Sequence, residues 1–284
     1  MAELSIIRTA SEVASWRAAL APSRRVALVP TMGFLHEGHA SLIREARRLV
    51  PSSEGEVVVS IFVNPTQFGP TEDLDRYPRD EEGDLQQCRA LGVDMAFCPL
   101  DPSTLYPSRQ TWVEVEGLAD GLCGRSRPGH FRGVCTVVTK LIALVRPDVS
   151  VFGEKDYQQL AIIRRMHTDL FLPGRVVGMP IVREPDGLAM SSRNTNLRPE
   201  DRRAALAIPR FADELRRRFS VGERNARGLV AEAEARLAPG RIDYVEVVDA
   251  VNLQPVELIE RPVLVAMAVR FGDVRLIDNL VLEP

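Results

Sequence analysis

Short apolar runs alternate with segments of helical periodicity over the first two thirds of the chain. The runs predict strands at Val26–Pro30, Val57–Val63, Met95–Cys98, Thr111–Val115, Val149–Phe152 and Val176–Val182. Apolar residues at helical spacing predict helices at Ala40–Val50, Glu81–Leu91, Phe131–Val145 and Asp156–Phe171. Strands that alternate with helices are typical of a parallel sheet whose faces are covered by helices. We therefore expect an α/β fold in this part of the chain.

The pattern changes after Ser192. Helical spacing predicts two helices, at Pro199–Phe219 and Arg227–Leu237. Three strands are predicted after them, at Arg241–Val248, Pro262–Phe271 and Val274–Leu282. The last two strands are joined by Gly272-Asp273, a two-residue hairpin signal, and turn residues gather at Glu184-Pro185-Asp186-Gly187. We predict a larger domain at residues 1–182 and a smaller α+β domain at 183–284.

Composition narrows the class of protein. The 284 residues are 45% hydrophobic, which is enough to bury a sizeable core. The formal net charge is −3 and no segment carries a basic block, so we expect no nucleic-acid partner. No apolar run approaches the roughly 20 residues that span a bilayer, and the first residues lack a signal pattern, so we expect no membrane partner and a cytoplasmic protein. Scattered cysteines predict reduced, buried thiols at Cys88, Cys98, Cys123 and Cys135.

The first crossover carries two histidines. His36-Glu37-Gly38-His39 lies between the predicted strand Val26–Pro30 and the next predicted helix. A helix start offers unpaired N–H groups and a partial positive charge to phosphates, and Gly38 lets a nucleotide approach the backbone. The segment is not a P-loop, because His39 replaces the lysine, and it does not fit H-E-x-x-H. Polyphosphate binding is favoured over the alternative, in which the two histidines are polar residues at a helix start without a functional role.

Lys155 is one of only two lysines in a chain with 34 arginines; the other is Lys140. A lysine supplies a compact point charge that the planar guanidinium of arginine cannot imitate. Gly153-Glu154-Lys155-Asp156 follows the predicted strand Val149–Phe152, so it lies at the carboxyl edge of the sheet, where nucleotides bind. We expect Lys155 to meet phosphate and Asp156 to bind a ribose hydroxyl or cap the helix. Gln159 lies one helical turn on, toward the same cleft.

Two further segments bear polar groups suited to ligands. Met190-Ser191-Ser192-Arg193 is a hydroxyl-rich loop near the predicted boundary that could close over a nucleotide. Asn64 and Gln67 end a strand beside Phe62 and Phe68, which suits a small substrate with hydroxyl and carboxylate groups on an apolar body. An ordinary turn is the alternative for each segment. No Ser-His-Asp or Cys-His arrangement is evident, so a covalent enzyme intermediate is not expected.

Together, these motifs resemble the pantoate–β-alanine ligase family, within the H-x-G-H nucleotidyltransferases. The four motifs occur in the family's order, at 30–39, 62–68, 153–159 and 190–193. The resemblance implies a Rossmann-like, doubly wound parallel sheet with a smaller C-terminal α+β domain. It also implies ATP-dependent condensation of pantoate with β-alanine through a pantoyl adenylate, with Mg²⁺ required, AMP and pyrophosphate released, and a homodimer as the assembly.

The resemblance also implies roles for individual residues. The catalytic residues would be His39 as proton donor, His36 at the phosphates, and Lys155. ATP would be bound by Met32, Gly33, Phe34, Leu35, His36, Glu37, Gly38, His39, Gly153, Glu154, Lys155, Asp156, Val182, Met190, Ser191, Ser192 and Arg193. Pantoate and β-alanine would be bound by Gln67, Gln159, Asn64, Phe62 and Met32. Asp84 and Gln87 match a region where the family binds magnesium, although Gly83 replaces an acidic residue there. His130 lies in a family segment but receives no chemical role.

Two alternative functions stay open at this point. A cytidylyltransferase of the same superfamily would share H-x-G-H but has no need of the amides of Asn64, Gln67 and Gln159. A non-catalytic nucleotide-binding module is the alternative from another class. Release of pyrophosphate from ATP that depends on pantoate distinguishes the ligase from both.

Overall fold

The computed structural model describes residues 3–70 and 72–284, which form two compact units. The large unit comprises the described residues of Met1–Val115, together with Arg127–Glu154 and Ile162–Pro180. The small unit comprises Ile181–Pro284 and two earlier segments, Glu116–Ser126 and Lys155–Ala161. The chain therefore enters the small unit twice before its C-terminal part.

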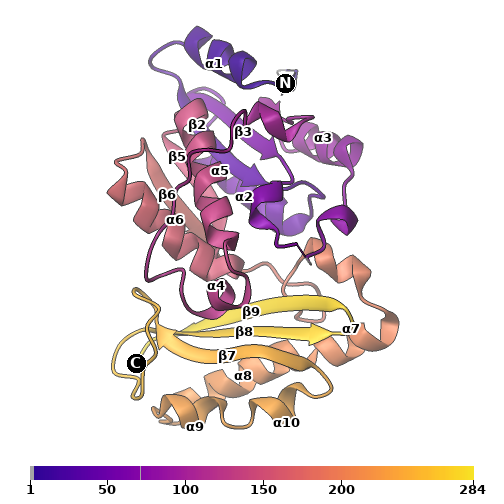
Figure 1. Cartoon of the computed structure of the whole chain (residues 1–284), viewed down its shortest axis with the longest axis vertical. Coiled ribbons are helices and arrows are strands. Elements are labelled where there is room, and N and C mark those ends of the chain that lie inside the picture. The colour runs from indigo at the N-terminus through magenta and orange to yellow at the C-terminus, as the bar shows by residue number, and fades with distance from the viewer. Residues whose placement is uncertain (1–2, 71) are drawn as a thin grey trace. The chain divides into compact units, whose positions relative to one another are not determined.

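The large unit is built on a parallel sheet of six strands within the described residues (Figure 1). In chain order the strands are β1 (Ser5–Ile7), β2 (Arg25–Thr31), β3 (Gly55–Ile61), β4 (Met95–Phe97), β5 (Val149–Gly153) and β6 (Arg175–Met179). Their order in the sheet is β1-β4-β3-β2-β5-β6. After β2 the chain thus moves outward to β3 and β4, beside the edge strand β1, and then returns to β5 on the other side of β2. This is the doubly wound arrangement, with its switch point between β2 and β5.

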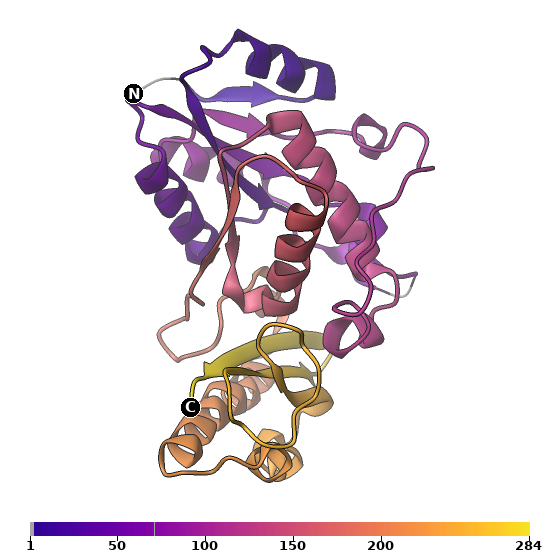
Figure 2. The same cartoon turned by 90° about the vertical axis from the view of Figure 1, so that its left-hand side faces the viewer.

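Helices cover both faces of this sheet (Figure 2). They are α1 (Ala10–Ala19), α2 (Glu37–Leu49), α3 (Glu81–Ala90), α5 (His130–Val145) and α6 (Tyr157–Asp169), the last of which begins in the small unit. α2 and α3 pack their apolar residues on the face that carries Ala27, Val29 and Val57. Because both faces are covered, Val26 to Val29 of β2 are completely buried, which explains the unbroken apolar run in the sequence.

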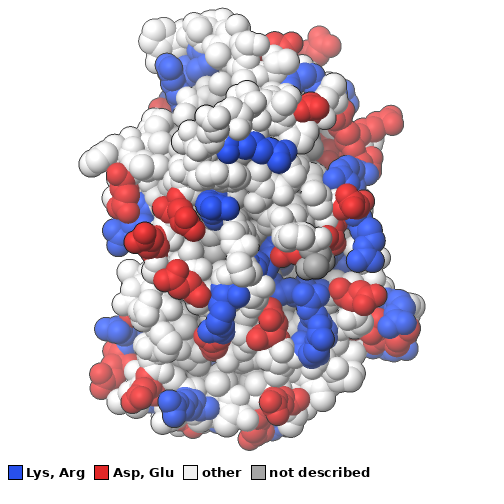
Figure 3. All heavy atoms as spheres, in the orientation of Figure 1, with Lys and Arg blue, Asp and Glu red and all other residues white. Residues whose placement is uncertain are grey.

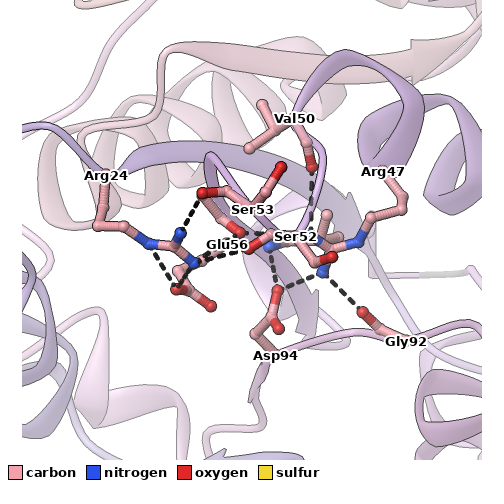
Figure 4. A network of polar contacts seen from close by, with 10 residues as sticks. Arg24, Arg47, Val50, Ser52, Ser53, Glu56, Gly92 and Asp94 are labelled. Atoms are coloured by element: carbon pink, nitrogen blue, oxygen red, sulfur yellow. Dashed lines mark hydrogen bonds and ion pairs between the residues drawn. The ribbon is translucent and has the colours of Figure 1, made fainter. Parts of the chain in front are cut away.

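The amino ends of the strands are tied together by ion pairs (Figure 4). Asp94, just before β4, pairs with Arg47 of α2 and accepts a hydrogen bond from the backbone N of Val57 at 2.7 Å. Arg24, just before β2, pairs with Glu56 of β3 at 2.6 Å. These contacts stabilise the edge of the sheet opposite to its carboxyl end.

The small unit contains an antiparallel sheet with strand order β7-β8-β9. Its strands are β7 (Arg241–Asp249), β8 (Val263–Phe271) and β9 (Val274–Leu282), and its helices are α4 (Leu122–Ser126), α7 (Pro199–Ala205), α8 (Ala207–Ser220), α9 (Ala226–Val230) and α10 (Ala233–Leu237). Phe271 pairs with Val274 across the two-residue turn at Gly272-Asp273, so the predicted hairpin is confirmed. Alternate residues of the sheet, among them Val265, share one buried apolar core with Phe211 and Leu215 of α8.

Several predicted elements differ from the observed ones. The strand predicted at Thr111–Val115 is wrong: the segment has no regular secondary structure and belongs to neither sheet of the described residues. The backbone N of Val113 instead donates to Thr136 Oγ1 of α5, and Arg132 lies over the ring of Trp112. The helix predicted at Pro199–Phe219 is two helices, because Pro209 lacks the N–H that would continue the first helix into the second. The helix predicted at Arg227–Leu237 is likewise two, and β1, α1 and α4 were not predicted.

The structure also describes the cysteines, the apolar character of the helices and the distribution of surface charge. All four cysteines are buried free thiols. In the part of the chain that the structure describes, no helix has the length and apolar character needed to cross a membrane. Basic and acidic side chains are interspersed over the face shown in Figure 3, as the small net charge suggests.

Candidate active site

The carboxyl ends of β2 and β5 lie side by side at the switch point of the large sheet. The two strands pair in parallel, with Leu28 beside Ser150, and end at Thr31 and Gly153. In doubly wound sheets, ligands bind outside the carboxyl ends of the strands at this point. β2 continues into the H-x-G-H segment, and β5 continues into a 3₁₀ turn at Glu154–Asp156.

The two histidines form a reciprocal cap at the start of α2. Nδ1 of His36 accepts from the backbone N of Gly38 at 3.1 Å, and the backbone N of His36 donates to Nδ1 of His39 at 3.2 Å. The ring centroids are 4.0 Å apart. A neutral imidazole that accepts at Nδ1 carries its proton on Nε2. The cap therefore selects the tautomer in which each ring donates from the edge opposite the helix backbone, next to the positive end of the helix dipole.

Gly38 is required by the position of the His36 ring. A Cβ at Gly38 would lie 2.9 Å from both Cε1 and Nδ1 of that ring. The sequence suggested that Gly38 allows a nucleotide to approach the backbone. The structure adds a steric reason, since any side chain here would push the His36 ring away from the helix start.

Asp84 of α3 holds the turn between β2 and the histidines. The turn has left-handed backbone at Gly33 (φ 79°) and Phe34 (φ 52°). The carboxylate of Asp84 accepts from the backbone N of Phe34 at 2.8 Å and from that of Leu35 at 2.6 Å, and the side chain is only 2% exposed. Burial raises the pKa of Asp84, and the two N–H donors oppose that rise. Gln87, one turn further along α3, donates to the carbonyl oxygen of Leu35 at 2.8 Å.

These contacts do not fit a magnesium site at Asp84 and Gln87. Mg²⁺ takes six oxygen ligands in near-octahedral geometry, whereas both Asp84 oxygens already accept backbone hydrogen bonds inside the protein. Within residues 3–70 and 72–284, no group of three or more His, Cys, Asp or Glu side chains is arranged to hold a metal. The contacts support a role in positioning the turn, and we assign no step of the reaction to a metal held by these two residues.

The predicted amide site is assembled in the large unit. Asn64 is 1% exposed and donates from Nδ2 to Oε1 of Gln67 at 3.0 Å. Gln67 donates from Nε2 to the sulfur of Met32 at 3.1 Å. Phe62, also buried, is joined to β2 by a hydrogen bond from its backbone N to the carbonyl of Thr31 at 3.1 Å. The structure thus brings together Met32, Phe62, Asn64 and Gln67, which the sequence placed on two different strand ends.

The sequence did not identify the residues that support these amides. Tyr106 donates from its hydroxyl to Oδ1 of Asn64 at 2.9 Å. His130 is buried, and its Nδ1 lies 2.9 Å from the carbonyl oxygen of Gln67, so this nitrogen carries the proton and donates. A Cβ at Gly133 would lie only 2.4 Å from the carbonyl oxygen of Thr66, so helix α5 packs directly on the turn that carries Gln67.

Other predicted site residues belong to the small unit. Lys155, Asp156, Gln159, Val182 and the segment Met190–Arg193 lie in it, whereas Gly153 and Glu154 belong to the large unit. The side chain of Lys155 is 21% exposed, and its Nζ lies 3.8 Å from Oδ2 of Asp156. Ser191 caps the short 3₁₀ helix that follows, accepting from the backbone N of Arg193 at 3.3 Å. The expected site residues are therefore divided between the two units.

Comparison with known proteins identifies the family. The family model described as pantoate-beta-alanine ligase matches residues 5–281. A pantothenate synthetase from Anaeromyxobacter dehalogenans is 55% identical over 278 residues, which is 95% of this chain and 96% of that protein. The crystal structure of pantothenate synthetase from Thermus thermophilus has a TM-score of 0.91 and 44% identity, covering 99% of this chain and 100% of that one. A pantoate-beta-alanine ligase from Francisella tularensis, complexed with beta-gamma ATP and beta-alanine, has a TM-score of 0.80 and 33% identity, covering 98% of each chain. The chain therefore belongs to the pantoate-beta-alanine ligase family, as its motifs predict.

Proposed function

We propose that this ligase condenses pantoate with β-alanine by forming a pantoyl adenylate from ATP and then transferring the pantoyl group. Membership of the family supports the reaction, and the relative crystallised with an ATP ligand and β-alanine supports the substrates. One observation in this chain carries the proposal: at the switch point of the sheet, two imidazoles are fixed as Nε2–H donors in the unit that also holds the cluster of Met32, Asn64 and Gln67.

In the first step, a carboxylate oxygen of pantoate attacks the α-phosphorus of ATP. An oxygen–phosphorus bond forms, the bond from the α-phosphorus to the bridging oxygen breaks, and pyrophosphate leaves. Catalysis of such a step consists largely of positioning and neutralisation of charge. His36 and His39 donate to phosphate oxygens, His39 next to the leaving group, and Lys155 supplies a point charge. Magnesium would enter with the triphosphate and neutralise part of its charge; in our proposal Asp84 and Gln87 do not hold it.

In the second step, the neutral amine of β-alanine attacks the acyl carbon of the adenylate. The amide bond forms, the nitrogen releases a proton to solvent, and AMP leaves with the electron pair of the acyl–oxygen bond. No enzyme nucleophile is needed, because adenylation has already created a good leaving group. Asn64 and Gln67, with Gln159, would hold the hydroxyl and carboxylate groups of pantoate. Phe62 and Met32 would contact its apolar body.

The two units would divide this work. We propose that residues 1–182 form the domain that binds ATP and pantoate, and that 183–284 form a lid over the mixed anhydride, excluding water. Lys155 and Gln159 are grouped with the small unit, so they would contact the substrates from that unit, as Met190–Arg193 would. The homodimer and the cytoplasmic location stay predictions.

Pyrophosphate release provides the test. With ATP and pantoate, but without β-alanine, the enzyme should release pyrophosphate in an amount close to the enzyme present, and β-alanine should allow turnover. His39→Ala should slow this release by a factor of about 10² or more, because a positioned donor is lost from a site where charge develops. Dependence on CTP instead of ATP would favour a cytidylyltransferase, and the absence of release would favour a binding module.

A further inference from the structure

Lys155 belongs to the small unit because its segment is bonded to that unit by several side chains. The hydroxyl of Tyr157 donates to the carbonyl oxygen of Ala250 at 3.1 Å. Gln158, which is buried, donates to the carbonyl oxygens of Leu118 and Gly121, each at 2.9 Å. Gln158 also accepts from the backbone N of Cys123 at 2.9 Å, with its Oε1. The start of α6 is therefore fixed within the small unit.

A further hydrogen bond holds the backbone of Lys155 itself. Nδ2 of Asn279, on β9, donates to the carbonyl oxygen of Lys155 at 2.9 Å. Burial along β9 alternates, and Arg275, Ile277 and Val281 on the face that includes Asn279 are each partly or fully exposed. Asn279 departs from this alternation, because it is only 7% exposed. A buried amide in a strand position that is otherwise partly open points to a specific polar contact, and the Lys155 carbonyl supplies it.

Asp278, the neighbour of Asn279 on β9, anchors the segment that leads to Met190–Arg193. Asp278, 2% exposed, binds Arg183 through two hydrogen bonds of 2.7 and 2.9 Å. Arg183 begins a tight hairpin that is closed by its bridge to Ala189, and Met190–Arg193 follows directly. Two adjacent residues of one strand, on opposite faces, thus hold the two segments of the small unit for which contacts with ATP are proposed.

We propose that Asn279 is a positioning residue for the nucleotide site. Asn279 holds the backbone of Lys155 on β9, and Asp278 beside it anchors the Arg183–Ala189 hairpin that leads into Met190–Arg193. It thereby presents the ammonium group and the Met190–Arg193 loop as one rigid piece. This inference rests on the proposed function, in which Lys155 meets the phosphates. Asn279 touches no substrate, and its effect passes through the position of Lys155.

A double-mutant cycle tests this role. Binding of an ATP analogue with a methylene group between its α- and β-phosphates is measured by titration calorimetry for Asn279→Ala, Lys155→Ala and the double variant. Loss of one hydrogen bond should weaken binding by Asn279→Ala about tenfold. In the Lys155→Ala background, the second substitution should change the dissociation constant by less than about twofold, because no ammonium group is left to misplace. A purely structural role for Asn279 would make the two effects additive.

The matched control is Asn225→Ala. Asn225 caps α9 in the same unit by accepting from the backbone N of Gly228 at 2.7 Å, so its loss costs a similar bond away from Lys155. Binding by this variant should match the wild type. If Asn279→Ala does not fold, as judged by circular dichroism, Asn279→Ser replaces it, since the shorter hydroxyl still loses the bond.

Unchanged affinity in a folded Asn279 variant, or additive effects in the cycle, would overturn the inference. Pantoate-dependent release of pyrophosphate by the wild type separates these failures from failure of the proposed function. If the wild type releases none, the proposed function is wrong and the inference falls with it.

Discussion

Replacing Asp84 by asparagine tests whether this buried carboxylate positions the histidines. In the wild type, both Asp84 oxygens accept from consecutive backbone N–H groups, those of Phe34 and Leu35, which directly precede His36. The amide in Asp84→Asn would retain one acceptor oxygen and place an NH₂ group against the second backbone N–H. That N–H and the NH₂ group facing it would then both be buried without an acceptor. The added volume is negligible, because the two side chains have the same shape.

The expected magnitude follows from the two bonds. A hydrogen bond to a charged group contributes about 1.5–3 kcal/mol, and leaving a buried donor unsatisfied costs about 1–3 kcal/mol. With the Asp84 side chain 2% exposed, water cannot replace the lost acceptor. We therefore expect the native turn to lose about 3 kcal/mol, which at about 1.4 kcal/mol per factor of ten is a fall of about 10² in kcat/KM for pyrophosphate release.

The matched control is Glu82→Gln. Glu82 lies in the same first turn of α3 and undergoes the same change from acid to amide, but its side chain is exposed. Rates of pyrophosphate release are measured for both variants over a series of magnesium concentrations, with melting curves to confirm folding. Positioning predicts a loss in Asp84→Asn that no magnesium concentration restores, and a normal rate in Glu82→Gln. Rescue of Asp84→Asn by high magnesium would show that Asp84 is a metal ligand, and a normal rate would refute the positioning role altogether.

Two further predictions concern packing and the thiols. Gly133→Ala should raise the KM for pantoate several-fold in steady-state assays, because the new Cβ would lie 2.4 Å from the Thr66 carbonyl oxygen and displace Gln67. Gly69→Ala is the control and should leave this KM unchanged, because its Cβ would meet nothing closer than 3.7 Å. Burial raises the pKa of three thiols to about 12, those of Cys88, Cys98 and Cys135. At about pH 8 only about one such thiol in 10⁴ is ionised, so mass spectrometry should find all three unmodified by iodoacetamide in the folded protein and modified in urea; rapid labelling without urea would contradict their burial.

The sequence predicted the elements that are long and fully buried. The apolar run around Val26–Val29 identifies β2 because both faces of that strand are covered, and the Gly272-Asp273 turn identifies the hairpin because few residues suit it. β1 has only three residues, too few for any periodicity. Thr111–Val115 has the apolar and β-branched residues of a strand, but the backbone N of Val113 donates to Thr136 of α5 instead of to another strand. Local pattern does not reveal which partner a segment finds.

The same limit applies to the site. The motifs predicted His36, His39, Asn64 and Gln67, because each lies within a few residues of a strand end. Contacts between distant parts of the chain stayed hidden. Asp84 lies 50 residues from Phe34 and 49 from Leu35, and Asn279 lies 124 from Lys155. The carboxylate of Asp84 was matched to metal binding from its position in the sequence, whereas its hydrogen bonds became evident only from the fold.

The central claim is that a pantoate carboxylate oxygen attacks the α-phosphorus of ATP before β-alanine reacts. Pantoate labelled with ¹⁸O in both carboxylate oxygens tests this most directly, with AMP and pyrophosphate analysed by mass spectrometry after complete turnover with β-alanine. Formation of an adenylate predicts one ¹⁸O atom in each AMP and none in pyrophosphate. Unlabelled AMP, or a labelled phosphate product released beside ADP, would contradict the account.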